Sequence, residues 1–342
     1  MGIKAEHWND GRSWDAYVQA KPTASQYHQW VWKSVIEETY GHSTHYLAAT
    51  ENGAIRGALP LVELKSWTFG HFLVSLPYFN YGGFLADSPE AEEALLSAAA
   101  ELARNLGARH IELRQGACCA VSWKEVCAKV AMVVRLPKTP EEMMARLSGR
   151  LRNKVRAASK AGFEVRWGGQ EMVPALYKVF AINMRNLGTP VYPRSWFENV
   201  MRRGGAEARI LALFDEAEPV AATLITTFRN AVELPWIASS PEGRKKYSTV
   251  LLYWTALEWA LAQGYTSVDL GRCTPGGGVY QFKRQWECEE VPLHWYYWLP
   301  AGVPVPELRP SNPRYRLAIR AWQKLPVPVA NWLGPRISRS IP

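Results

Sequence analysis

The alternation of apolar and polar residues predicts the same series of elements in each half of the chain. After a first helix, residues 45–64 and 209–228 have the pattern of two strands around a turn, and residues 71–79 and 231–239 follow as a third apolar strand. An amphipathic helix then ends at Gly107 in one half and at Gly264 in the other, and a short apolar strand follows each glycine. This order predicts an α/β fold, of the α+β kind, with two similar domains.

The two halves also agree residue by residue around these glycines. Gly107 and Gly264 are 264 − 107 = 157 positions apart, and the same offset relates three further pairs: Ala103 and Ala260, Ile111 and Val268, Glu112 and Asp269. Chance similarity rarely preserves both the order and the type of elements, so we predict an internal duplication. Two unrelated helix–strand pairs are the alternative.

Length and composition favour a reduced, cytoplasmic protein. A chain of 342 residues with 48% apolar residues is long enough for about two domains. It contains no apolar stretch of about 18 residues, and its first residues lack the apolar region of a signal peptide. Its five cysteines form no CxxC pair and no pattern typical of a disulfide framework.

The formal net charge of +9 is concentrated near the C-terminus. Residues 309–342 contain no acidic residue and seven basic ones, which are Arg309, Arg314, Arg316, Arg320, Lys324, Arg336 and Arg339. The rest of the chain therefore carries only 9 − 7 = +2. Apolar residues on the other face predict an amphipathic helix, which suits contact with an anionic membrane and equally suits docking on the body of the protein.

The order of elements is that of the GNAT acyltransferase fold. The segments LRNKVRAASKAGFEV (151–165), DLGR (269–272) and FKRQW (282–286) resemble the Fem-type peptidyltransferases, which add amino acids to cell-wall precursors. LPYFNYGGF (76–84) and the C-terminal tail resemble a narrower FemAB-like branch associated with exosortase/PEP-CTERM and exopolysaccharide loci. The resemblance implies two tandem GNAT-like domains, each a mixed, mostly antiparallel sheet flanked by helices. We expect them at 1–145 and 146–300, with an amphipathic tail at 301–342.

Neither half contains the pyrophosphate loop of ordinary GNAT enzymes, in which amides at a helix N-terminus bind the phosphates of acetyl-CoA. At the equivalent place the first half has the acidic stretch NYGGFLADSPEAEE, and the second half has SSPEGRKKYSTVLL. We therefore expect the first half to be a scaffold that also lines part of the binding site for the acceptor. The donor stays open between aminoacyl-tRNA and acyl-CoA, and no permanently bound cofactor is expected.

The segment GRCTPGGGVYQFKRQW (271–286) carries the main catalytic candidates. Three glycines after a proline are weak evidence for a phosphate loop, and a simple turn is the plainer interpretation. We expect residues 279–286 to be extended again, so that Lys283 and Arg272 face one cleft from adjacent strands. Phe282 and Trp286 would hold the charge of Lys283 near apolar surface, which strengthens its contact with a phosphate or an oxyanion.

Asp269 completes the predicted catalytic set, because in Fem-type enzymes the matching lysine and the aspartate–arginine strand line the reaction cleft. By this resemblance Lys283 and Arg272 bind a phosphate or the oxyanion. Asp269, expected where a strand ends, orients the amine nucleophile or accepts its proton. The alternative is that Asp269 only pairs with one of the two cations.

Nine residues are predicted to contact substrate: Tyr78, Asn80, Tyr81, Arg185, Tyr192, Arg244, Lys246, Tyr247 and Tyr280. The first three lie just past a predicted strand end, where an aromatic ring can stack on a sugar. Residues 185 and 192 resemble acceptor-side positions. Residues 244–247 precede a helix that Ser248 or Thr249 would cap, so cations there would stand at its positive end. A solvated loop is the alternative.

Residues 146–160 form a predicted helix with one apolar face and one dense cationic face. The predicted phosphate- or nucleic-acid-binding residues on it are Arg150, Arg152, Lys154 and Arg156. Cations without an interleaved acid favour binding to tRNA or to a lipid-linked pyrophosphate over a merely solvated surface.

Together these patterns predict an aminoacyl- or acyltransferase that acts on an amine or hydroxyl of an envelope polysaccharide, an exopolysaccharide or its lipid-linked precursor. An acyl-CoA-dependent N-acyltransferase and a non-catalytic glycan- or lipid-binding protein of an export system are the alternatives. We expect no metal, since His42 and His45 lack a third ligand, and no cysteine nucleophile. The expected location is the cytoplasm, at the inner face of the membrane if the tail binds lipid.

Overall fold

The computed structural model describes residues 2–204, 207–306 and 313–341, except for the side chains of residues 313–315. Arg309 and the side chain of Arg314, both in the predicted basic tail, therefore lie outside the described residues. The chain divides into two compact units. Unit 1 consists of Met1–Ala128, Pro292–Glu307 and Arg339–Pro342, and unit 2 consists of Lys129–Val291 and Leu308–Ser338.

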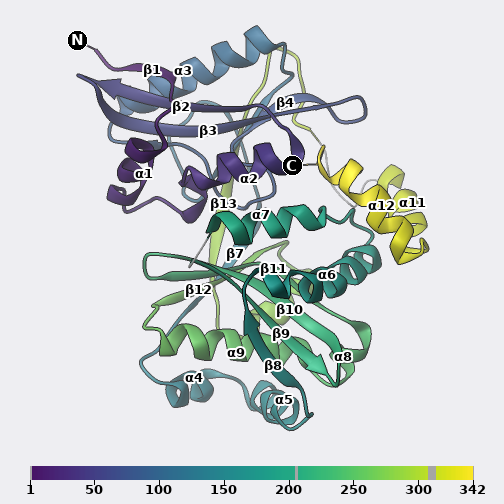
Figure 1. Cartoon of the computed structure of the whole chain (residues 1–342). Coiled ribbons are helices and arrows are strands. Elements are labelled where there is room, and N and C mark those ends of the chain that lie inside the picture. Colours follow the sequence, from purple (N-terminus) through teal and green to yellow (C-terminus); the bar gives the residue numbers. More distant parts are fainter. Residues whose placement is uncertain (1, 205–206, 307–312, 342) are drawn as a thin grey trace. The chain divides into compact units, whose positions relative to one another are not determined.

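Unit 1 is one sheet with helices on both faces. Its elements are β1 (Lys4–His7), α1 (Gly11–Ala20), η1 (Gln26–His28), α2 (Val31–Tyr40), β2 (Thr44–Glu51), β3 (Ala54–Ser66), β4 (Gly70–Val74), β5 (Leu85–Ala86), α3 (Pro89–Leu106), β6 (Ile111–Gln115) and most of β13 (Glu289–Trp298). The strand order is β1-β2-β3-β4-β6-β13, with β5 paired to β3. Only β4 and β6 are parallel. Figure 1 shows α3 on one face and α1 and α2 on the other.

Unit 2 has the same plan and additional helices. Its elements are most of β7 (Lys124–Arg135), α4 (Pro140–Arg146), α5 (Gly149–Ser159), β8 (Glu164–Gly168), η2 (Gln170–Met172), α6 (Val173–Leu187), α7 (Arg194–Gly204), β9 (Ala208–Asp215), β10 (Glu218–Phe228), β11 (Ala231–Ser239), α8 (Pro241–Lys245), α9 (Ser248–Ala262), β12 (Ser267–Cys273), α10 (Gly278–Arg284), α11 (Pro313–Gln323) and α12 (Val327–Ser338). The strand order is β7-β12-β11-β10-β9-β8. α6 and α7 cover one face, and α9 covers the other (Figure 1).

The strands of the two units follow one topology, as the predicted duplication requires. β1, β2, β3, β4 and β6 correspond in order and direction to β8, β9, β10, β11 and β12, and each unit has one parallel pair followed by an antiparallel last strand. The last strand of each unit comes from the sequence position expected for the other unit. β7 follows β6 in the sequence but pairs with β12, whereas β13 follows β12 but pairs with β6.

Local sequence signals fix most element ends. The Asn52-Gly53 turn joins β2 and β3 with φ of 51° and 79°, the left-handed geometry that this dipeptide favours in hairpins. The Ser88 hydroxyl caps α3 by accepting from the amide of Ala91 at 3.3 Å. Gly107 then ends α3 with φ of 68°, as predicted, and Gly264 has φ of 80° just after α9.

One predicted strand is too long and another is wrong. Residues 71–79 do not continue as a strand, because β4 ends at Val74 and the backbone of Leu76 and Tyr78 has φ of 56° and 76°. Residues 279–286 are not extended, because α10 covers most of them. Phe282 and Trp286 are four residues apart, so a helix places both on one face. Each ring packs against that of Tyr253, at 5.3 and 5.7 Å.

In unit 1, its own side chains fill the space beyond the parallel pair β4–β6. Arg114 is 1% exposed and forms a buried ion pair with Glu112 at 2.7 Å. The Arg114 guanidinium also donates to the carbonyl of Phe79 at 2.7 Å, and the Tyr297 hydroxyl donates to Glu112 at 2.9 Å. The amide of Gly83 donates to the carbonyl of Arg114. The loop after β4 is thereby fastened to β6.

We expect Arg114→Met to lower the free energy of unfolding by about 3–5 kcal/mol, because it leaves the Glu112 carboxylate buried without its cation. Urea unfolding measures the change. Lys178→Met removes one partner of the exposed pair with Glu218 and should cost at most about 1 kcal/mol. Equal effects of the two substitutions would contradict the structural role of the buried pair.

Candidate functional site

The two parallel strands of unit 2 separate where the catalytic candidates lie. β11 and β12 pair only over Ala231–Glu233 and Ser267–Asp269. Beyond this, β11 has two residues, 234 and 235, opposite one residue of β10, and β12 has two, 270 and 271, opposite one residue of β7. Bulges of this kind bend a strand away from its partner. We call residues 233–235 and 269–272 the fork.

The ammonium group of Lys283 lies at the fork. Nζ donates to the carbonyls of Gly271 at 2.9 Å and Arg272 at 3.2 Å, and the side chain is 4% exposed. A Cβ placed on Gly271 would lie 3.6 Å from this Nζ and 3.8 Å from the carbonyl oxygen of Leu234, so the cation stands beside both strands. An ammonium has three N–H donors, and two are used here.

The glycine run before α10 is a turn that lets the helix begin. The amide of Gly277 donates to the carbonyl of Thr274 at 3.1 Å, Gly276 has φ of 79°, and Gly277 is the N-cap of α10. Because Phe282 and Trp286 anchor α10 on α9, Lys283 lies on the inner side of the helix. The geometry thus matches the predicted turn and not a phosphate loop.

Burial and nearby charges set the protonation of the fork. Burial lowers the pKa of Lys283. The negative charge of Asp269 raises this pKa, and the positive charge of Arg272 lowers it further. Burial also raises the pKa of Cys273, and it raises that of Cys288 to about 12, so both thiols stay neutral. The structure brings Lys283, Asp269 and Arg272 together at the fork.

Asp269 and Arg272 lie inside β12, whereas the sequence prediction placed them at and after the end of a strand. The bulge explains the difference, because it turns the chain without ending the strand. The Asp269 carboxylate accepts from the amide of Gly271 at 2.7 Å, and Gly271 has φ of 82°. A residue with a side chain would be strained at this position.

Glu233 is a functional candidate that the sequence reasoning missed. It is 7% exposed and is the register partner of Asp269 in the last pair of β11 and β12, where the fork begins. Side chains of paired residues in neighbouring parallel strands point to the same face of the sheet, so two carboxylates are neighbours there. The signal was present in AVELPWIAS (231–239), where Glu233 is the one charged residue of an apolar strand.

The start of α9, where an ordinary GNAT enzyme binds pyrophosphate, is covered by α8. A Cβ on Gly243 of α8 would lie 2.6 Å from Oγ of Ser248 and 2.9 Å from Cβ of Val220. The predicted cap by Ser248 or Thr249 is wrong: the N-cap is Tyr247, with φ of 61° and no side-chain hydrogen bond. The residues before α9 instead form the short helix α8, which Ser240 caps, so neither predicted residue is the N-cap of α9.

The candidate residues of this turn have protein partners or face solvent. Arg244 donates to the carbonyl of Ser239 at 2.6 Å, and Lys246 pairs with Asp215 at 2.7 Å. Tyr247 is 42% exposed.

The other three residues of unit 2 that were predicted to contact substrate lie outside this turn. Arg185 donates to the carbonyl of Gln323 in α11 at 3.1 Å. The ring of Tyr192 packs against Trp196 at 5.8 Å, and the hydroxyl of Tyr280 donates to Glu290.

The predicted sugar-stacking residues of unit 1 are mostly buried. The Tyr78 hydroxyl donates to the carbonyl of Arg339 and lies 3.0 Å from Nε2 of His42. Asn80 is buried, and the half-buried ring of Tyr81 lies parallel to that of Tyr27 at 6.4 Å. Of the three, only Tyr81 offers an aromatic face at the surface of unit 1.

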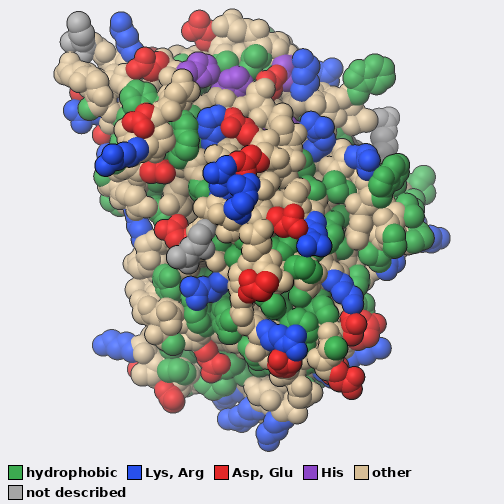
Figure 2. Space-filling view, in the orientation of Figure 1, with side chains coloured by type: hydrophobic (Ala, Val, Ile, Leu, Met, Phe, Trp, Pro, Cys, Tyr) green, Lys and Arg blue, Asp and Glu red, His purple; other side chains and the backbone are tan. Residues whose placement is uncertain are grey.

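Two of the four predicted cations of α5 are exposed, and two are partly buried. Arg150 and Arg156 are exposed, Lys154 is half-buried, and Figure 2 shows Lys and Arg side chains gathered over α5 at the bottom of the view. Arg152 instead donates to the carbonyls of Ala145 and Leu147 at 3.2 and 2.9 Å, and so binds the end of α4.

The tail forms two helices that pack on α6. A Cβ on Gly188 would lie 2.4 Å from Ile319 of α11, and one on Gly334 of α12 would lie 2.8 Å from Val191. Leu317 and Trp332 remain 74% and 62% exposed. Within unit 2 the tail therefore docks on the body of the protein, which was one of the two predicted alternatives. Some of its apolar side chains are still exposed. Among the described residues, no helix has both the length and the apolar character needed to cross a membrane.

In the described part of the chain, one group of three side chains has donors close enough to hold a metal ion. Cys118, Glu125 and His294 of unit 1 have donor atoms within 4.8 Å of one another. Sequence reasoning missed the group because His294 is far from Cys118 and Glu125 in the sequence. Glu125 and His294 already form an ion pair at 2.5 Å.

Comparisons with known proteins support this fold. Residues 145–284 match the acetyltransferase (GNAT) domain. The chain is 26% identical over 245 residues to the lipid II:glycine glycyltransferase of Staphylococcus epidermidis, a match that covers 61% of this chain. It spans 56% of that relative's length.

Two solved structures have the same arrangement of elements. FemX has a TM-score of 0.66 at 17% identity and covers 86% of this chain and 97% of its own. A tandem GNAT protein from the clavulanic acid pathway has a TM-score of 0.57 at 13% identity, with coverage of 89% and 99%. The chain thus has a mixed α/β fold of two tandem GNAT-like units.

The buried state of Lys283 predicts how stability depends on pH. Because burial lowers its pKa, the folded protein releases this proton at a lower pH than the unfolded chain. Between the two pKa values the unfolded state binds more protons, so the wild-type protein gains stability relative to Lys283→Met as the pH rises. The slope reaches up to about 1.4 kcal/mol per pH unit below about pH 10.5.

Urea unfolding of both proteins from pH 7 to 10.5 measures this difference. The exposed Lys160 provides the control, since Lys160→Met should change stability equally at every pH. Parallel curves for the wild type and Lys283→Met would contradict the lowered pKa.

Proposed function

We propose that the chain is an aminoacyltransferase that acts on an amine or hydroxyl of a lipid-linked precursor of the cell envelope. The observation that carries this proposal is the buried ammonium of Lys283 at the fork of a GNAT-like unit. The GNAT match at residues 145–284 and the likeness to a lipid II:glycine glycyltransferase support it.

The residues of the fork suit acyl transfer. The acceptor amine attacks the carbonyl carbon of an ester-linked donor, a C–N bond forms, and the C–O bond to the leaving hydroxyl breaks. Nζ of Lys283 donates to the oxyanion of the tetrahedral intermediate, where a fixed donor away from water is most effective. Asp269, with Glu233 beside it, takes the proton of the amine and returns it to the leaving oxygen. Arg272 adds positive charge for a donor phosphate.

Aminoacyl-tRNA is the donor that the local structure favours. The short helix α8, which packs against Ser248 at the start of α9, stands in place of the loop that binds the CoA pyrophosphate in other GNAT enzymes. The exposed cations of α5 suit the closely spaced phosphates of RNA. Acyl-CoA is the alternative donor, and stabilisation of the protein by CoA but not by tRNA would favour it.

The acceptor is proposed from the chain's resemblances and its tail. The relative's substrate, lipid II, is lipid-linked. The resemblance of LPYFNYGGF and the tail to proteins of exosortase and exopolysaccharide loci suggests a polysaccharide precursor in place of a peptidoglycan one. The exposed Leu317 and Trp332, on basic helices, would bring the protein to the inner face of an anionic membrane.

We expect Lys283→Met to reduce transfer by about 10²–10³-fold, the usual effect of losing one oxyanion donor. The assay measures radiolabel that passes from aminoacyl-tRNA into the butanol-extractable lipids of bacterial membranes. Lys178→Met, which removes an exposed lysine outside α5 and the fork, should transfer at the wild-type rate. Equal rates for both variants, or no transfer by the wild type from aminoacyl-tRNA or acyl-CoA, would contradict the proposal.

The cationic face of α5 gives a separate prediction. Substitution of Arg150, Lys154 and Arg156 by Gln should weaken tRNA binding and lower the salt dependence of log Kd by about one per lost phosphate contact. Filter binding at several salt concentrations measures both. The matched control replaces Arg316 and Arg320 of α11 and Lys324, which directly follows it, by Gln, and so removes the same charge elsewhere. Equal weakening by the two triple variants would show only an effect of net charge.

A further inference from the structure

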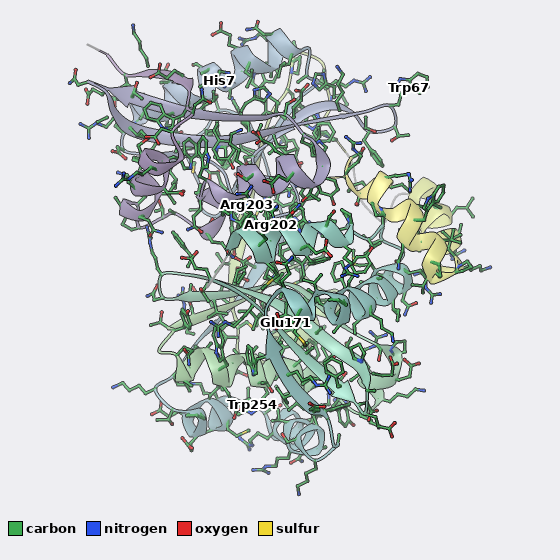
Figure 3. All side chains as sticks on the ribbon, viewed as in Figure 1. His7, Trp67, Glu171, Arg202, Arg203 and Trp254 are labelled. Carbon is green, nitrogen blue, oxygen red and sulfur yellow. The ribbon has the colours of Figure 1, made fainter. Side chains whose placement is uncertain are left out.

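The hairpin between β3 and β4 carries a tryptophan that the rest of unit 1 leaves in solvent. Trp67 has a relative exposed area of 106%, and Figure 3 shows its side chain projecting beyond the end of the hairpin. The backbone of the tip is hydrogen-bonded, since the Ser66 hydroxyl accepts from the amides of Thr68 and Phe69 at 3.2 and 3.3 Å. A held tip therefore presents a large aromatic surface to a partner.

Two cations stand beside this tryptophan. The exposed Lys65 and Arg109 line, together with Trp67, a hollow of about 420 Å³ that Ser66, Gly70 and His71 complete. None of these six lining residues is acidic. The nearby Glu63 of β3 is held by His71 at 2.7 Å and lies 3.7 Å from His45. The tip thus combines an aromatic side chain with net positive charge.

We propose that residues 65–71 with Arg109 bind the surface of an anionic phospholipid bilayer. Tryptophan favours the headgroup region, where its ring is in apolar contact and its N–H is hydrated. Lys65 and Arg109 attract anionic headgroups, and the hollow between them and Trp67 takes a phosphate. A neutral sugar would stack on Trp67 but would gain nothing from the two cations, so the charge favours lipid over glycan. The binding needs neither donor nor acceptor and is therefore separable from the transferase proposal.

Amide hydrogen exchange with lipid vesicles tests the hairpin directly, because it reports on residues 66–72 apart from the tail. Vesicles of phosphatidylcholine with one-third phosphatidylglycerol should slow exchange there, and vesicles of phosphatidylcholine alone should not. The variant with Arg316, Arg320 and Lys324 replaced by Gln should keep this protection even if its total vesicle binding falls. Unchanged exchange at residues 66–72 with anionic vesicles would overturn the proposal.

Co-sedimentation with the same vesicles measures the partition coefficient. Lys65→Ser and Arg109→Ser should each lower it about fivefold, the effect of one cation near an anionic surface. Trp67→Ala should lower it at least as much, with an unchanged melting temperature because the side chain is fully exposed. Trp332→Ala, which removes another exposed tryptophan, should leave the protection of residues 66–72 intact. Protection by a neutral polysaccharide or by inorganic phosphate, without protection by vesicles, would also overturn the proposal.

Discussion

The structure of unit 2 depends on the burial of one ammonium group between two strands that separate. A buried cation is costly unless polar atoms surround it, and here the carbonyls of Gly271 and Arg272 do so. The surrounding features serve this contact: the bulges open the fork, Gly271 adopts a positive φ, and α10 is anchored on α9 through Phe282 and Trp286. Burial lowers the pKa of Lys283 because a low-dielectric setting disfavours the charged form.

The comparison of the two units shows what duplication allowed. Both have a parallel pair at the same place in the same topology, β4–β6 in unit 1 and β11–β12 in unit 2. In unit 1 the buried pair of Arg114 and Glu112 and the loop after β4 close the space. In unit 2 the corresponding space receives a lysine from a later helix. The same place in the topology thus holds a buried ion pair in unit 1 and a buried lysine in unit 2.

Local signals in the sequence predicted much of this fold, and non-local ones were missed. Asn52-Gly53, Gly107 and Gly264 mark their turns and helix ends because backbone geometry at these residues is a local property. Lys283, Arg272 and Asp269 were identified by resemblance, and the structure places them together. Residues 279–286 were predicted to be extended, although Phe282 and Trp286 have the four-residue spacing of one helix face. The exchange of β7 and β13 and the pairing of Glu233 with Asp269 depend on contacts between distant segments, which periodicity does not encode.

The central claim is that acyl transfer occurs at the fork, with the reacting carbonyl bound by Lys283. A crystal structure with a non-hydrolysable mimic of the aminoacylated 3′ end of tRNA, amide-linked in place of the ester, tests it most directly. The account predicts that the carbonyl oxygen of the mimic lies within about 3 Å of Nζ of Lys283, between β11 and β12. A mimic bound with its carbonyl away from Lys283 would contradict it.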